Sequence, residues 1–212
     1  LALTAAGSNT LSTTISGSGV FALSSGVTLT LAAGATVTNQ HFTVASGATL
    51  SAGSLTGSIG GLSGAGAVLV GSNTLVISDL ANAGSVSSLP VFSGQLYSTG
   101  TSATSGGLTI SVTGAQPTGT QIAGQAIGST LTYTGVTTIN SGATLALVTG
   151  GSIAASSGVT VNSGGTLMVG TGGSSAETGF IRGLSGSGNV VLNGISGFSD
   201  TLSITAANTT FS

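Results

Sequence analysis

The stretch VTVNSGGTL, Val159–Leu167, decides the fold of this chain, because it reads as a strand, a tight turn and a second strand. Its two valines flank a threonine, and this alternation places apolar side chains on one face of a strand and a hydroxyl on the other. Asn162 tolerates the left-handed backbone of a turn, and Gly164 and Gly165 adopt a positive φ without a Cβ clash. We therefore predict that Gly164 and Gly165 are structural turn residues.

The same unit occurs three more times in the chain. A short unit of this kind cannot bury its apolar face alone, whereas stacked copies bury a continuous column of side chains. The distance in sequence between the copies that begin at Thr137 and Val159 suits one coil of a β-helix. The first two copies, which begin at Leu29 and Phe42, lie much closer together, which predicts coils of unequal length. The other copies are LTLAAGATV (Leu29–Val37), FTVASGATL (Phe42–Leu50) and TTINSGATL (Thr137–Leu145).

A longer duplication supports the repeat. GLSGAGAVLVG (Gly61–Gly71) matches GLSGSGNVVLNG (Gly183–Gly194), and NTLVIS (Asn73–Ser78) resembles DTLSIT (Asp200–Thr205). Amphipathic helical patterns are missing, good helix formers such as Glu and Lys are almost absent, and no apolar run reaches the roughly 18 residues of a membrane helix. We predict an all-β fold, a parallel β-helix (β-solenoid) of roughly eight to ten coils, with no transmembrane segment.

The chain carries very little charge. Charged residues make up 2% of the sequence, against about 25% in an ordinary domain. One Arg and no Lys cannot neutralise a phosphate backbone, which excludes nucleic acid as a partner. A net charge of −2 gives little repulsion between copies, and a solenoid exposes a sheet edge at each end. Both features predict a homo-oligomer or filament formed through the solenoid ends or faces.

Three segments are distinguished by composition. We predict N-terminal solenoid coils over residues 1–84, an atypical insertion or irregular coils over 85–132, and C-terminal coils over 133–212. The middle segment holds both prolines and four of the five glutamines. Because proline cannot donate to a β-ladder, it belongs at edges, bulges or loops, so an irregular coil, a hairpin or a lateral subdomain is expected in this segment.

The motifs NSGATL, SSGVTVNSGGTL, GLSGSGNVVL and LSITAANTTFS together resemble the passenger domains of bacterial autotransporters, particularly their autotransporter-associated β-strand repeats. The resemblance covers about 29–79 and 130–212. It implies a right-handed parallel β-helix, export through the outer membrane, and a place on the bacterial cell surface. It further implies that the chain is an adhesin or a structural stalk.

No catalytic, cofactor-binding or metal-binding constellation is visible, so we predict that the chain is not an enzyme and needs no cofactor. His41 is the only histidine and is expected in a solvated loop, with no acid nearby in the sequence. Glu177 and Arg182 are close enough to pair across a turn. Asp79 and Asp200 each lack a neighbouring carboxylate, so acid–base chemistry lacks its second member locally.

Two groups of residues are assigned non-catalytic roles. Asn140 and Asn162 occupy equivalent positions in successive repeat units and are predicted to stack as an amide ladder, with Gly142 at the turn. In the atypical segment, the residues expected to contact a surface or carbohydrate ligand are Phe92, Gln95 and Tyr97.

Three functions follow from these features. The first is an extracellular structural protein, a self-associating solenoid that forms a filament, sheath or matrix. The second is an adhesin that displays a binding surface. The third is ice binding by a flat face of threonines, for which the Thr-x-Thr units at 28–30, 36–38 and 130–132 are candidates. These units do not recur at one coil period, so a regular array is not expected.

Overall fold

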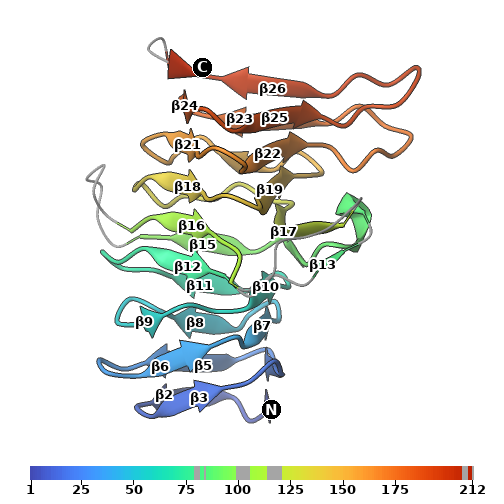
Figure 1. The fold of residues 1–212 in the computed structure, drawn as a ribbon. Helices are drawn as coiled ribbons and strands as arrows, with labels where there is room; N and C mark the ends of the chain where they lie inside the picture. The colour runs from blue at the N-terminus through green and yellow to red at the C-terminus, as the bar shows by residue number, and fades with distance from the viewer. Residues whose placement is uncertain (79–81, 84, 99–105, 114–120, 207–209, 212) are drawn as a thin grey trace.

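The computed structural model describes residues 1–78, 82–83, 85–98, 106–113, 121–206 and 210–211. The chain winds into a parallel β-solenoid of about eight turns with almost no helix, and its two termini lie at opposite ends of the rod (Figure 1). This confirms the predicted all-β parallel β-solenoid. Among the described residues, no helix is long and apolar enough to cross a membrane.

Each full turn contributes one strand to each of three faces, which we call faces A, B and C. Pairing within a face is parallel, so each face is a ladder that runs the length of the rod. Single bridges from Gly64 to Phe92 and from Ile59 to Ile77 join the two halves of faces A and C. On face B, the amides of Thr132 and Tyr133 donate to the carbonyl of Leu96 and make the same connection.

The strands are assigned to the faces in chain order. Face A contains β1 (Ala2–Leu3), β4 (Val20–Leu23), β7 (His41–Val44), β10 (Gly61–Ser63), β14 (Val91–Phe92), β17 (Ile122–Ile127), β19 (Ala143–Leu147), β22 (Thr166–Val169) and β25 (Asn189–Leu192). Face B contains β2 (Gly7–Leu11), β5 (Val27–Leu31), β8 (Thr49–Ser51), β11 (Ala67–Leu69), β15 (Gln95–Tyr97), β20 (Ser152–Ile153), β23 (Thr178–Ile181) and β26 (Thr201–Ile204). Face C contains β3 (Thr14–Ser16), β6 (Thr36–Thr38), β9 (Thr56–Gly57), β12 (Leu75–Ile77), β16 (Leu108–Ile110), β18 (Thr137–Ile139), β21 (Val159–Val161), β24 (Leu184–Gly186) and β27 (Thr210–Phe211).

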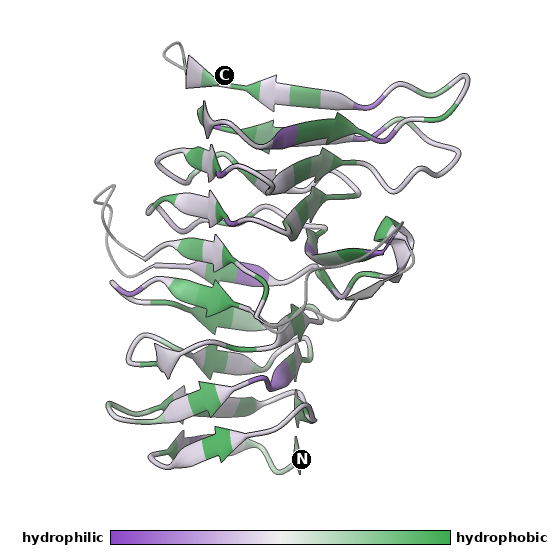
Figure 2. Ribbon diagram, in the orientation of Figure 1, coloured by the Kyte–Doolittle hydropathy of each residue, from purple (hydrophilic) through white to green (hydrophobic). Residues whose placement is uncertain are grey.

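The core is built from columns of inward-facing side chains, one residue per turn. On face B, Leu29 pairs with Leu50, and Leu50 with Val68, and all three side chains are buried. Strand alternation sends every second residue inward, and the coil spacing of about 4.8 Å brings the members of a column into contact. Hydrophobic residues recur on strands from one end of the rod to the other (Figure 2).

The repeat unit recognised in the sequence is a corner of the rod. Residues 29–37 turn from face B to face C, whereas 42–50 turn from face A to face B in the next coil. The short spacing of these two copies is therefore a distance between different corners, and the inference of unequal coils from it was wrong. Coil length does vary elsewhere, because Thr49 pairs with Ala67 one turn on, whereas Leu75 pairs with the much more distant Leu108.

The long duplication is displaced by one corner. Residues 61–69 run from face A to face B, and the matching residues 183–192 run from face C to face A. The downstream pair is displaced in the same way, because β12 lies on face C and β26 on face B. The same local sequence can therefore form any of the three corners between faces. The pairing of its strands with the neighbouring turns decides which corner it forms.

A short arm leaves the rod at the start of the predicted atypical segment and projects from its side (Figure 1). It contains β13 (Asn82–Ala83), which pairs antiparallel with β17, and the 3₁₀ turn η1 (Val86–Ser88). A second, smaller hydrophobic cluster packs the arm onto the outside of face A, and its members are Val86, Leu89, Ala126, Ala146, Val148 and Met168. Strands β15, β16 and β17 rejoin the three faces, so the departure from the rod is local.

Candidate functional site: the ends of the rod and its polar columns

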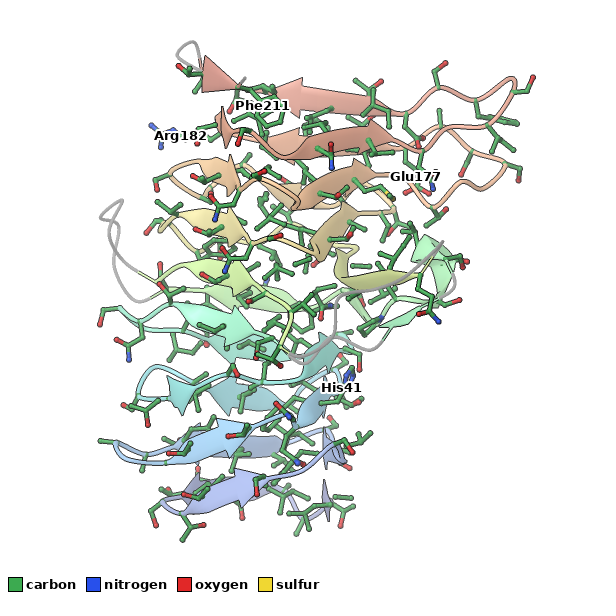
Figure 3. The ribbon with its side chains drawn as sticks, viewed as in Figure 1. His41, Glu177, Arg182 and Phe211 are labelled. Carbon is green, nitrogen blue, oxygen red and sulfur yellow. The ribbon has the colours of Figure 1, made fainter. Side chains whose placement is uncertain are left out.

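The last described turn at the C-terminal end carries large apolar side chains at inward positions. Three core columns, one from each face, end in Leu192, Ile204 and Phe211, whose side chains are 50%, 40% and 39% exposed. Val169 and Ile181, one turn below the first two, are fully buried. Phe211 lies at the tip of the rod (Figure 3). Large apolar side chains at inward positions are thus presented to the outside.

The N-terminal end has the same character. Leu3, Leu11 and Ile15 stand at inward positions of the first turn and are only partly buried against the core. Leu1 and Val20 are exposed. The described ends of the solenoid therefore both present apolar side chains and the unpaired edge of a parallel ladder, which is a template for further strands.

The two acidic residues of the C-terminal coils lie in one column at the corner between faces A and B. Asp200 precedes β26 and Glu177 precedes β23. The two strands pair with each other, and Thr201 lies opposite Thr178. The Glu177 carboxylate accepts hydrogen bonds from the Thr149 amide (2.6 Å) and the Thr171 hydroxyl (2.9 Å). The Asp200 carboxylate accepts one from the Glu177 amide (2.8 Å). Each acid thus fastens its loop to the turn below.

The expected pair between Glu177 and Arg182 does not form. The two residues flank β23 at its opposite ends, and their side chains point away from each other (Figure 3). Arg182 is exposed, while Glu177 is buried by its bonds to the coil below. The sequence separation suggested proximity, but an extended strand holds the residues apart. The other candidate acid, Asp79, lies outside the described residues.

The asparagines of the repeat units meet across coils. The Asn162 side-chain amide donates to the Asn140 carbonyl oxygen at 2.8 Å. At the same corner, the Gly142 amide donates to the Gly164 carbonyl at 2.9 Å, and the two glycines have φ of 76° and 78°. A Cβ on Gly165 would lie 2.8 Å from the Ile139 carbonyl oxygen, so glycine permits close approach of the coils there.

The three residues proposed as an adhesive group do not form one surface. Phe92 is fully buried in a core column of face A, where it pairs with Ile127, so it cannot contact a ligand and that part of the prediction is wrong. Gln95 and Tyr97 occupy outward positions of β15 on face B. Gln95 is exposed and lines a shallow groove of about 250 Å³ together with Thr49 and Ala67.

His41 lies on a strand, contrary to the prediction of a loop histidine. It is the first residue of β7 and pairs with Val20 below and Gly61 above. Its Nε2 lies 3.1 Å from the Ser63 hydroxyl, which lies 3.0 Å from the Thr43 hydroxyl. His41 is far from Glu177 along the rod (Figure 3). The serine–histidine contact is therefore part of an outward polar column, and the acids among the described residues, Glu177 and Asp200, both lie in the C-terminal coils, away from the histidine that an acid would orient in a catalytic triad.

Stability is expected to fall as the pH is lowered below about 6.5. Burial lowers the pKa of His41 from its ordinary value of 6.5, so the folded state favours neutral imidazole. The resulting stabilisation is fully present above the unfolded-state pKa and is lost as the pH falls toward the folded-state pKa. Melting temperatures measured at intervals between about pH 7.5 and 5 should show this decline. His41→Gln should flatten it, and an unchanged profile in that variant would contradict the assignment.

Gln125 is the polar residue whose role the sequence did not reveal. Its side chain is fully buried at an inward position of β17. Its Oε1 accepts from the Leu62 amide at 3.0 Å, and its Nε2 donates to the carbonyls of Leu62 and Pro90, each at 2.8 Å. The amide therefore links two turns where the arm returns to the rod.

Among the described residues, no group of three or more His, Cys, Asp or Glu side chains is placed to hold a metal ion. Comparisons with models of protein families, with curated proteins and with solved structures find no match for the chain. The autotransporter resemblance therefore rests on the sequence motifs and on a β-solenoid fold that is consistent with it.

Proposed function

We propose that this chain is an extracellular structural protein whose solenoids stack end to end into a filament, sheath or matrix. The observation that carries the proposal is that the strands of all three faces run in parallel ladders along the rod, with Leu192, Ile204 and Phe211 at inward positions of the last described turn and 39–50% exposed.

A second copy is the occupant that fits this surface best. The first turn of a copy carries β1, β2 and β3, one for each face, in the same parallel sense as β25, β26 and β27. Stacked head to tail, the first turn would continue all three ladders and all three core columns. A contact of this kind uses different surfaces on the two copies and does not close, so it generates an open filament.

Electrostatics and the family resemblance support the same function. The net charge of −2 leaves little repulsion between copies, and no charged side chain occurs before Asp79. A place on the bacterial cell surface is proposed from the resemblance to autotransporter passengers. Stalks of that kind need length and stiffness, which a stacked rod provides.

We expect the purified chain at neutral pH to form filaments in electron micrographs, with a layer spacing of about 4.8 Å along the axis. The triple variant Leu192→Asp, Ile204→Asp and Phe211→Asp should abolish these filaments, because each interface would then desolvate three charges. Phe180→Asp is the matched control, since Phe180 is 38% exposed but lies on the side of the rod.

Loss of filaments in the end variant alone, with unchanged melting temperature, would support end-to-end stacking. Discrete single rods from the unmodified chain would overturn it, and the ends would then be covered by something other than a second copy. That result would favour the second candidate, an adhesin, for which the exposed Gln95 beside its groove on face B is the supporting observation.

A further inference from the structure

Face B carries a regular array of hydroxyl groups over the first three turns. The outward residues are Ser8 and Thr10 on β2, Thr28 and Thr30 on β5, and Thr49 and Ser51 on β8. The strand register places them in two columns, because Thr28 pairs with Ser8 and Thr49, and Thr30 pairs with Thr10 and Ser51. The Thr-x-Thr unit at 28–30 thus recurs at the coil period once serine is counted, which corrects the expectation drawn from threonine alone.

These six hydroxyls are free to bond water. None of them has a hydrogen-bond partner within the described part of the chain. Other polar columns differ, since Thr160 and Ser185 on face C bond each other at 3.0 Å and Ser63 on face A bonds His41 and Thr43. No charged side chain precedes Asp79 in the sequence, so no strongly hydrated side chain from these turns competes for water near the array.

The β-scaffold fixes the spacing of the array in two directions. Neighbouring turns lie about 4.8 Å apart, and alternate residues along a strand lie about 6.7 Å apart. β-Branched threonine has few rotamers, so its hydroxyl and methyl are held in place with little entropy left to lose. Oxygen atoms in ice repeat with spacings of this size in two dimensions, whereas liquid water and flexible ligands have no such repeat.

We propose that the array of Ser8, Thr10, Thr28, Thr30, Thr49 and Ser51 on face B binds the surface of ice through ordered water. The hydroxyls hold a layer of water by hydrogen bonds. The threonine methyls between them make no hydrogen bonds to water, so they do not disturb the order of that layer. This activity uses the side of the rod and does not depend on the end-to-end stacking proposed above.

The test measures thermal hysteresis, the shape of ice crystals, and partition of the protein into growing ice. The unmodified chain is expected to show thermal hysteresis and to enter the ice. Thr30→Tyr should lose most of both effects, because Thr30 has array neighbours above, below and along its strand. Thr160→Tyr is the matched control, an outward threonine on β21 of face C that should retain both effects.

Circular dichroism melting curves establish that both variants fold. The triple aspartate variant at the C-terminal end should retain ice binding without filaments, which separates this activity from self-association. No thermal hysteresis and no entry into ice by the unmodified chain would overturn the proposal. Equal activity in Thr30→Tyr and the unmodified chain would overturn the assignment to face B.

Discussion

Replacing Gln125 with leucine is expected to lower the free energy of unfolding by about 3–5 kcal/mol. The side chain is fully buried and bonds the amide and carbonyl of Leu62 and the carbonyl of Pro90. Leucine has a similar size but no polar atom, so these buried backbone groups would lose their partner. Each unsatisfied group costs about 1–3 kcal/mol, and partial relaxation of the coils reduces the sum.

The reason for this large effect lies in the route of the chain. Face A continues from β10 to β14, but the bridge between Gly64 and Phe92 sets Pro90 opposite Leu62. The amide and carbonyl of Leu62 point toward β14, as those of Gly64 do, but they bond the Gln125 side chain instead of a backbone partner. Gln125, one turn further on, therefore supplies a primary amide in the place of a ladder partner for Leu62. The arm can therefore leave and rejoin the rod without breaking the ladder.

Chemical denaturation followed by circular dichroism measures this effect. Gln95→Leu is the matched control, because it makes the same substitution at an exposed outward position of β15. It should change the free energy of unfolding by no more than about 0.5 kcal/mol. Equal stability of the two variants would show that the amide of Gln125 is not needed at the junction.

The local sequence predicts the strands and corners of the rod well. Alternating valine and threonine followed by Asn-Ser-Gly define a strand and its turn, as at Val159–Gly165, and both properties are set by residues within the unit. The sequence of a unit does not determine which of the three corners that unit forms. Residues 42–50 and 159–167 have nearly the same sequence but turn between different faces, because their place depends on how many residues each preceding loop has used.

The candidate sites were harder to predict for the same reason. Phe92 and Gln95 are close in the sequence, yet strand pairing with Ile127 buries the first while the second faces solvent. Leu192 occupies the same inward column as Leu147, but it lies in the last described turn, where it is 50% exposed. Burial in a solenoid is decided by neighbours one coil away, which here are between 18 (Thr49 and Ala67) and 35 (Phe92 and Ile127) residues distant in the sequence.

Replacing Gly186 with alanine is expected to lower the free energy of unfolding by about 3 kcal/mol or more. Gly186 has φ +104°, and a Cβ there would overlap the carbonyl oxygen of Val161 in the turn below. Because that oxygen belongs to the backbone of a core strand, no side chain can move aside to make room. The two coils would have to separate at this corner, which would break contacts along the adjoining faces.

Gly197→Ala is the control that isolates the contact between coils. Gly197 has φ +91°, so alanine meets a comparable backbone penalty of about 1–2 kcal/mol, but nothing lies within 4 Å of its Cβ position. Gly64→Ala should behave as Gly186→Ala does, since its Cβ would overlap the Val44 carbonyl oxygen at φ +96°. Thermal and denaturant unfolding of the three variants would compare them directly. If Gly64 and Gly186 matched Gly197 instead, backbone strain alone would explain the glycines, and the duplicated GLSGxG motif would not be a coil-to-coil contact.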